Sequence, residues 1–112
     1  MTEAKYFLVV RFWVAPEAVA RVSRWLEGGH VTEVVSQPGF LWCRRLNLKE
    51  KDEKGWSAFS MLYGIESRRA FEKYESDQEL KSKFARQREP FEKLMRIERF
   101  SGEVDFALNK GG

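Results

Sequence analysis

The first apolar segment of the chain runs from Tyr6 to Val14 and has hydrophobic residues at nearly every position. It is rich in β-branched and aromatic side chains and is followed by Pro16, which is typical of a β-strand. Arg11 is the one charged residue in it. A strand with one face in water would carry polar residues at alternate positions. Both faces of this strand are therefore predicted to be covered.

The apolar spacing then changes to that of a helix. Residues at intervals of three and four predict a helix over about residues 16–27, with Pro16 suited to its first turn. The apolar stripe of this helix consists of Val19, Val22, Trp25 and Leu26. Gly28-Gly29 interrupts the pattern. We expect the helix to continue, kinked, to about Ser36, and to end at Gln37-Pro38-Gly39, because proline lacks an N–H and glycine tolerates a positive φ.

Two further strands are predicted over Phe40–Leu48 and Trp56–Ile65. The charged run KEKDEKG separates them. Its length favours a flexible hairpin loop over a two-residue turn.

The last third of the chain again has helical spacing. Ser67 and Asp77 are placed to cap two helices. The second of these keeps an apolar phase through Met95, with a kink or restart at Pro90. Beyond Gly102, alternation predicts the final strand, with apolar residues at Val104, Phe106 and Leu108.

The predicted order is β-α-β-β-α-β, an α+β arrangement in which a four-stranded antiparallel sheet carries its helices on one face. Residues 1–112 are expected to form a single domain. The other sheet face would then be bare in a monomer, although Phe7, Val9 and Trp13 lie on it. Exposed apolar patches of this kind mark interfaces. We predict a homodimer in which the two sheet faces pack together.

One set of residues follows an order known from other proteins: Trp25, His30, Pro38-Gly39-Phe40, the strand FSMLYGI, Phe71 and Tyr74. With these residues the chain resembles the dimeric α+β barrel superfamily of ferredoxin-like proteins, over about residues 6–108. Its pattern is similar to that of a small family of uncharacterised bacterial domains, and the order W…H…PGF resembles the EthD-like branch. The resemblance implies the fold. It does not imply one activity, because the superfamily includes monooxygenases, haem-degrading enzymes, isomerases, dehydratases and non-enzymatic binding domains.

Composition excludes several classes of protein. The single cysteine, Cys43, allows no intramolecular disulfide and no cysteine cluster for zinc. The net charge of +3 is modest and the charges are mixed in sign, so no nucleic-acid partner is predicted. No segment approaches the length of a membrane span and no signal sequence is apparent. We expect a cytoplasmic location and no membrane partner.

His30, the only histidine, is the candidate catalytic residue. A lone neutral imidazole can act as a general base near neutral pH. The resemblance also makes haem conceivable, because a helix histidine ligates iron in some haem-binding members. With no second histidine, neither a metal site nor a cofactor is predicted. We predict that His30 lines a cleft and that Glu33 orients its ring; the alternative is a structural histidine that satisfies a carbonyl at the helix break.

Arg11, Trp13, Trp42 and Tyr63 are the candidate ligand-binding residues. Arg11 either binds an anionic ligand or pairs with Glu103 or Asp105 on the last strand. The aromatic residues wall a pocket for a hydrophobic ligand, or else pack in the core and the dimer interface. Arg44 and Arg45 lie on opposite faces of their strand, and the sequence leaves open which one points inward.

Two hypotheses for function follow. In the first, the chain is a dimeric small-molecule-binding protein, such as a cofactor-independent oxygenase or an isomerase-like enzyme acting on a hydrophobic or aromatic substrate. In the second, it is a non-enzymatic homodimerising module with a structural or regulatory role.

Overall fold

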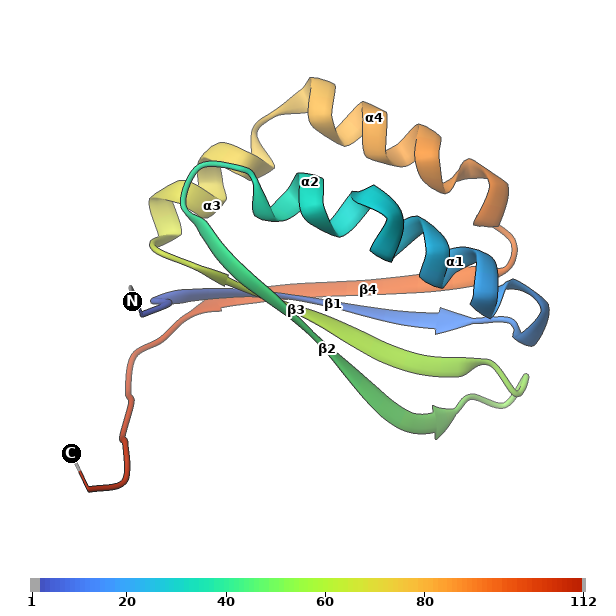
Figure 1. Ribbon diagram of the computed structural model, residues 1–112, viewed down its shortest axis with the longest axis horizontal. Helices are drawn as coiled ribbons and strands as arrows, with labels where there is room; N and C mark the ends of the chain where they lie inside the picture. The colour runs from blue at the N-terminus through green and yellow to red at the C-terminus, as the bar shows by residue number, and fades with distance from the viewer. Residues whose placement is uncertain (1–2, 112) are drawn as a thin grey trace.

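Four antiparallel strands form the sheet on which the molecule is built (Figure 1). The computed structural model describes residues 3–111. The strands lie in the order β2-β3-β1-β4, and their bounds are β1 Tyr6–Val14, β2 Phe40–Lys51, β3 Ser57–Ile65 and β4 Met95–Glu103. With the helices between them, this order is the ferredoxin-like α+β fold, which confirms the predicted fold class.

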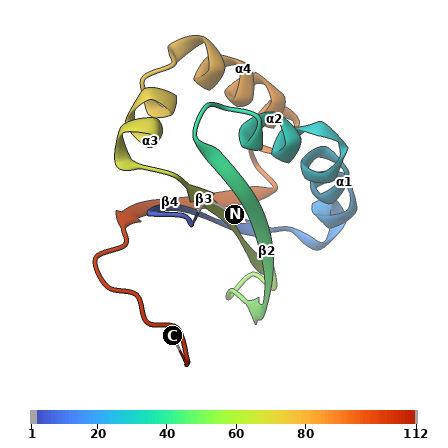
Figure 2. The ribbon, with the colours of Figure 1, turned by 60° about the vertical axis from the view of Figure 1, so that its left-hand side comes forward.

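All of the helices lie over one face of the sheet (Figures 1 and 2). They are α1 Val19–Trp25, α2 Val31–Val35, α3 Arg68–Glu75 and α4 Gln78–Arg88. The predicted caps are confirmed: the Ala70 amide donates to Ser67 Oγ over 3.1 Å, and the Leu80 amide donates to Asp77 Oδ1 over 3.0 Å. No helix within residues 3–111 has the length and apolar character needed to cross a lipid bilayer.

The core lies between this helical layer and the inner face of the sheet. Leu8, Val14 and Ile65 on the strands are almost fully buried. They pack with buried residues from the helices, namely Ala18, Val22, Leu26, Val34, Phe71 and Phe84. Burying one such large side chain contributes about 1.5–3 kcal/mol to folding.

The β2–β3 hairpin has a longer first strand and a shorter turn than predicted. β2 extends to Lys51 instead of ending near Leu48, and only a short turn remains. Asp52 Oδ1 accepts hydrogen bonds from the amides of Lys54 and Trp56, each over 2.9 Å. The predicted long loop is instead a short turn, because the Asp52 side chain adds two hydrogen bonds to the backbone ones from the Gly55 amide to the Asp52 carbonyl and from the Asp52 amide to the Trp56 carbonyl.

The prediction for the last strand is also wrong. β4 begins at Met95, where a helix was expected, and ends at Glu103, so Val104, Phe106 and Leu108 lie beyond the strand. α4 ends at Arg88 and a short 3-10 turn, Glu89–Phe91, leads into β4. β4 pairs with β1 along the entire length of β1. That pairing outweighs the helical phase of this charged segment.

The outer face of the sheet, on the side away from the helices, carries the residues that alternate with the buried ones. Trp13 is 8% exposed there: the Arg11 and Arg96 guanidinium groups lie 5.7 and 5.0 Å from its ring, and its Nε1 donates to Glu98 Oε1 over 3.0 Å. Phe100 on β4 is 62% exposed. Beyond β4 the C-terminal segment leaves on this same side (Figure 1), with Phe106 and Leu108 each 79% exposed.

Candidate functional site

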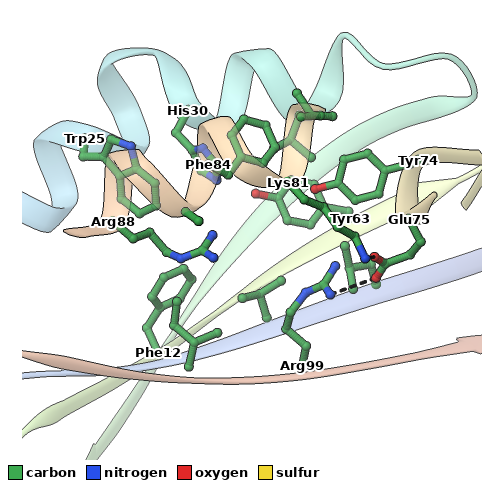
Figure 3. A pocket seen from close by; sticks show the side chains of 16 residues that line it. Phe12, Trp25, His30, Tyr63, Tyr74, Glu75, Lys81, Phe84, Arg88 and Arg99 are labelled. Carbon is green, nitrogen blue, oxygen red and sulfur yellow. Dashed lines mark ion pairs between the residues drawn. The ribbon is translucent and has the colours of Figure 1, made fainter. Parts of the chain in front are cut away.

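A cavity of about 470 Å³ lies between the inner face of the sheet and the helices. Figure 3 shows its walls, which come from β1, β3, β4, α3, α4 and the helical segment that carries Trp25 and His30. Most of the lining is apolar or aromatic: Leu8, Val10, Phe12, Trp25, Val34, Tyr63, Tyr74, Leu80, Phe84, Ala85 and Ile97. A volume of this size is within the range of sites for small molecules.

The helix over the cavity has an irregular turn that brings Trp25 and His30 together. Residues five apart in a regular α-helix point about 140° away from each other. Leu26–His30 instead forms a wider π-type turn, in which the Val31 amide donates to the Leu26 carbonyl. Gly29 takes a φ of 155° in this turn, a conformation that glycine adopts at little cost. The two rings therefore stack, with centroids 4.2 Å apart and planes at 23°.

His30 is held on both sides by aromatic rings. The Phe84 ring meets it edge-on, with centroids 4.5 Å apart, and the stacked Trp25 donates from Nε1 to Gln87 Oε1 over 3.1 Å. Within residues 3–111 the His30 Nδ1 is buried and has no hydrogen-bond partner. His30 thus lies in the cavity wall, and one of its ring nitrogens is buried without a hydrogen-bond partner from the described part of the chain.

The same surroundings disfavour a charged imidazole. Burial lowers the pKa of His30 from its usual 6.5 to about 4; the nearby polar side chain of Gln87 opposes this, and the Arg88 cation adds to it. The ring is therefore neutral at pH 7. Glu33 was expected to orient the ring, but its carboxylate forms an ion pair with Lys83, so that expectation is wrong.

The polar part of the lining is dominated by cations. Glu75 is the one carboxylate among the lining residues, and it pairs with Arg99 Nη1 at 2.8 Å and with Lys81 Nζ at 3.1 Å. Burial alone would raise the pKa of Glu75, but these two partners hold it below its usual range. Glu75 is therefore a carboxylate near neutral pH and neutralises one of its two neighbours.

Arg88, at the end of α4, is the third cation of the lining. Within residues 3–111 no carboxylate lies within ion-pairing distance of it. Burial lowers the pKa of its guanidinium, and the nearby Arg99 cation lowers it further. Figure 3 shows both guanidinium groups extending into the cavity, Arg88 from above and Arg99 from the sheet.

The residues proposed from sequence do not converge on one site. His30 and Tyr63 line the cavity. Arg11, Trp13 and Trp42 lie on the outer face, separated from the cavity by the sheet itself. Arg11 does not pair with Glu103, because the β1–β4 register places Glu98 opposite Arg11 and Glu103 opposite Tyr6.

The two adjacent arginines of β2 point to opposite faces of the sheet. Arg45 lies on the helical side and pairs with Glu27 at 2.7 Å, through Nη1 and Oε2. Arg44 lies on the outer face over the Trp42 ring, 5.1 Å from its centroid.

Several residues of the cavity were missed in the sequence, among them Phe12, Tyr74, Glu75, Arg88 and Arg99. A signal for Arg88 existed, because Leu80, Phe84 and Arg88 are spaced four apart and share a helix face. Arg99 could not be found while the last strand was placed too late in the chain. Within residues 3–111 there is no group of three or more His, Cys, Asp or Glu side chains that could hold a metal ion.

Comparison with known proteins gives a family and a fold. Residues 5–97 match a family model described as a domain of unknown function, DUF4286. No curated protein matches the sequence.

The solved structures that resemble the chain share its fold at low sequence identity. SnoaB from Streptomyces nogalater, described as a cofactor-independent oxygenase, has a TM-score of 0.64 and 18% identity, covering 96% of this chain and 99% of its own. The ActVA-Orf6 monooxygenase from Streptomyces coelicolor, solved with nanaomycin D, has a TM-score of 0.58 and 18% identity, covering 95% and 94%. The haem-degrading protein MhuD from Mycobacterium tuberculosis, solved with two haems in its active site, has a TM-score of 0.63 and 17% identity, covering 93% and 99%.

Proposed function

The chain belongs to the DUF4286 family of domains of unknown function, and from the cavity we propose that it binds an aromatic small molecule between its sheet and its helices. The observation that supports this most directly is the make-up of the walls. Five aromatic side chains and a stacked imidazole surround about 470 Å³. Aromatic rings that face a cavity favour flat, apolar ligands by stacking and edge contacts.

The activity we propose is removal of a proton from the bound ligand, as a first step of oxygenase or isomerase chemistry. His30 is neutral and its Nδ1 has no hydrogen-bond partner within residues 3–111; because that atom is buried, the imidazole has to turn toward the ligand to accept the proton. With a pKa of about 4 it is a weak base, so the proton transfer needs the product anion to be stabilised. The Arg88 and Arg99 guanidinium groups supply that stabilisation. SnoaB, a cofactor-independent oxygenase with the same fold, agrees with a reaction of this kind.

We also propose that two copies associate through their outer sheet faces. Apolar side chains on that face, including Phe7, Val9 and Leu62, alternate with the buried ones. Phe100 and the C-terminal Phe106 and Leu108 are exposed on the same side. An interface of roughly 1,600 Å² is usual for a stable dimer. Arg11, Trp13 and Trp42 would then contact the partner copy instead of the ligand.

The resemblance to the EthD-like branch and the cytoplasmic location stay predictions. The alternative function, a homodimerising module without a ligand, needs only the outer face. It leaves the unpaired Arg88 and the unpartnered His30 Nδ1 without a role, and for that reason we favour the binding function.

Binding is tested by titrating the protein with 2-naphthamide, a neutral bicyclic aromatic, and following tryptophan fluorescence. Trp25 is the one tryptophan that lines the cavity, so Trp25→Phe should remove most of the response while Trp56→Phe retains it. No saturable response in the wild type would reject the proposal.

The reaction is tested with anthrone, a tricyclic ketone with an acidic methylene group, in an oxygen electrode. Conversion of anthrone and O2 to anthraquinone and water above the rate without protein would support oxygenase chemistry. Saturable binding of 2-naphthamide with no added oxygen uptake would favour a binding function without this reaction.

A further inference from the structure

The charges that surround the cavity are unbalanced. Lys81, Arg88 and Arg99 are cations, Glu75 is the one carboxylate of the lining, and His30 is neutral. Glu75 offsets one positive charge, which leaves a surplus of two in a space walled mostly by apolar atoms. Charges near such walls interact more strongly than in bulk water. The cavity is therefore favourable for an anion.

Arg88 is the cation best placed to receive that anion. Arg99 and Lys81 already share Glu75, whereas Arg88 has no carboxylate partner within residues 3–111. It is half-buried, and its strongest charged neighbour is another cation, Arg99. Bringing two guanidinium groups together costs free energy that an intervening anion would recover. Guanidinium also binds a carboxylate through two parallel hydrogen bonds.

The uncharged ring system of such a ligand would lie among the aromatic side chains of the cavity, apart from the anionic group at Arg88. The rings of Phe12, Trp25 and Tyr63 line the cavity, with Trp25 beside His30, Phe12 near the Arg88 guanidinium and Tyr63 toward Tyr74 (Figure 3). A flat ring system seated among them would put a substituent within reach of Arg88. The His30 ring lies in the wall of the same cavity, beside Trp25.

We propose that the ligand of this cavity is an aromatic acid, and that Arg88 is the residue that selects it by binding its carboxylate or an equivalent anionic oxygen. The inference rests on the proposed binding function and adds to it the charge of the ligand and the residue that binds the charged group. The competing explanation is that Arg88 is a solvated arginine at the rim of the cavity and contributes nothing to selectivity.

The test compares two ligands that differ in charge and hardly in shape. 2-Naphthoate carries a carboxylate at pH 7.5, where a carboxylic acid is ionised, and 2-naphthamide is neutral. Their dissociation constants are measured by isothermal titration calorimetry on the wild type, Arg88→Gln, Arg88→Lys and Arg86→Gln. Arg86 lies on the same helix, is exposed and does not line the cavity, which makes it the matched control.

For the wild type and Arg86→Gln we expect 2-naphthoate to bind about tenfold or more tightly than 2-naphthamide, because charge-assisted hydrogen bonds are the stronger ones. Arg88→Gln should remove this preference and leave the affinity for 2-naphthamide within about twofold. Arg88→Lys should retain part of the preference, because lysine keeps the charge but lacks the planar fork.

The outcomes separate this inference from the proposed function. Equal binding of both ligands by the wild type would overturn the selectivity for acids and leave the binding function standing. Binding of neither ligand would overturn both. A preference for 2-naphthoate that persists unchanged in Arg88→Gln would show that Arg99 or Lys81 reads the charge, which contradicts the role assigned to Arg88.

The melting temperature distinguishes an Arg88 that serves the ligand from an Arg88 that stabilises the fold. Arg88→Gln removes a half-buried cation that faces another cation, so its melting temperature should equal or exceed that of the wild type. A clear decrease would mean that Arg88 stabilises the fold through contacts of its own.

Discussion

The Trp42 indole lies directly against the backbone of Gly64 on the outer face of the sheet. A Cβ atom at Gly64 would be 2.3 Å from Cε2 of that ring, and the two residues are cross-strand partners on β2 and β3. The Phe7 ring meets the indole edge-on from β1, with centroids 5.4 Å apart. The absence of a side chain at Gly64 is therefore what lets the Trp42 ring lie against β3 and reach the Phe7 ring on β1.

Gly64→Ala should destabilise the protein by about 1–3 kcal/mol, because the added methyl group forces a rigid ring out of its place. Urea unfolding measures the change. Gly102→Ala is the matched control: Gly102 is opposite Phe7 on β4, and a Cβ there would meet nothing within 4 Å. Equal stability of the two variants would mean that the Trp42 ring moves aside at little cost.

The neutral His30 predicts a specific pH dependence of stability. Its pKa is about 4 in the folded chain and near 6.5 when unfolded. Between these values the unfolded state binds a proton that the folded state does not, so His30 lowers the free energy of unfolding as the pH falls from about 6.5 to 4. His30→Gln should lose this part of the decrease, measured by urea unfolding at pH 5 and pH 7.

The ring can also be followed directly, because it is the only histidine of the chain. Its Cε1 proton resonance should titrate well below pH 6. A midpoint near 6.5 would contradict the burial of the ring and its placement between Trp25 and Phe84.

Trp25→Ala should lower the free energy of unfolding by about 3 kcal/mol, the lower end of the range for a large aromatic residue, because the ring is only partly buried. It loses the stacking with His30 and the hydrogen bond to Gln87. Trp56→Ala serves as the comparison, since that ring contacts the Lys54 ammonium group at 5.2 Å. A cation–π contact of this kind contributes about 0.5–1 kcal/mol. Similar losses in both variants would argue against Trp25 as a central packing residue.

The exposed C-terminal segment should contribute to the proposed homodimer. Replacing Phe106 and Leu108, both 79% exposed, with serine should weaken self-association by about tenfold or more, because each loses apolar area available to a partner. Analytical ultracentrifugation over a dilution series measures this, with Lys110→Ser as the control in the same segment. A wild-type protein that sediments as a monomer at about 10 µM would refute the dimer, because a stable dimer is associated at such concentrations.

The sequence predicted well those elements whose apolar residues follow a single spacing, either that of a strand or that of a helix. β1, with apolar residues on both faces, and the capped helices beginning after Ser67 and Asp77 all form as expected. β4 was misplaced because Arg96, Glu98 and Arg99 put charges on both of its faces. Its position depends on hydrogen bonds to β1, which local pattern cannot reveal.

The candidate site was predicted less well for a related reason. His30 and Tyr63 were found because histidine and strand aromatics stand out in a sequence. Alternation along β1 shows that Arg11 and Trp13 share a face, but not whether that face is the one with the cavity. The charge surplus arises from residues on three elements, α3, α4 and β4, and only the tertiary structure brings these together.

The wide turn at Leu26–His30 has a consequence for comparing this chain with its relatives. Such a turn is equivalent to one residue inserted into a regular helix, and Gly28 and Gly29 are both exposed, with free space around them. In a protein of this fold whose helix is uninterrupted, the ring that stacks on the tryptophan would be the fourth residue after it, not the fifth. An alignment without a gap at these glycines would pair His30 with a position that faces away from the cavity.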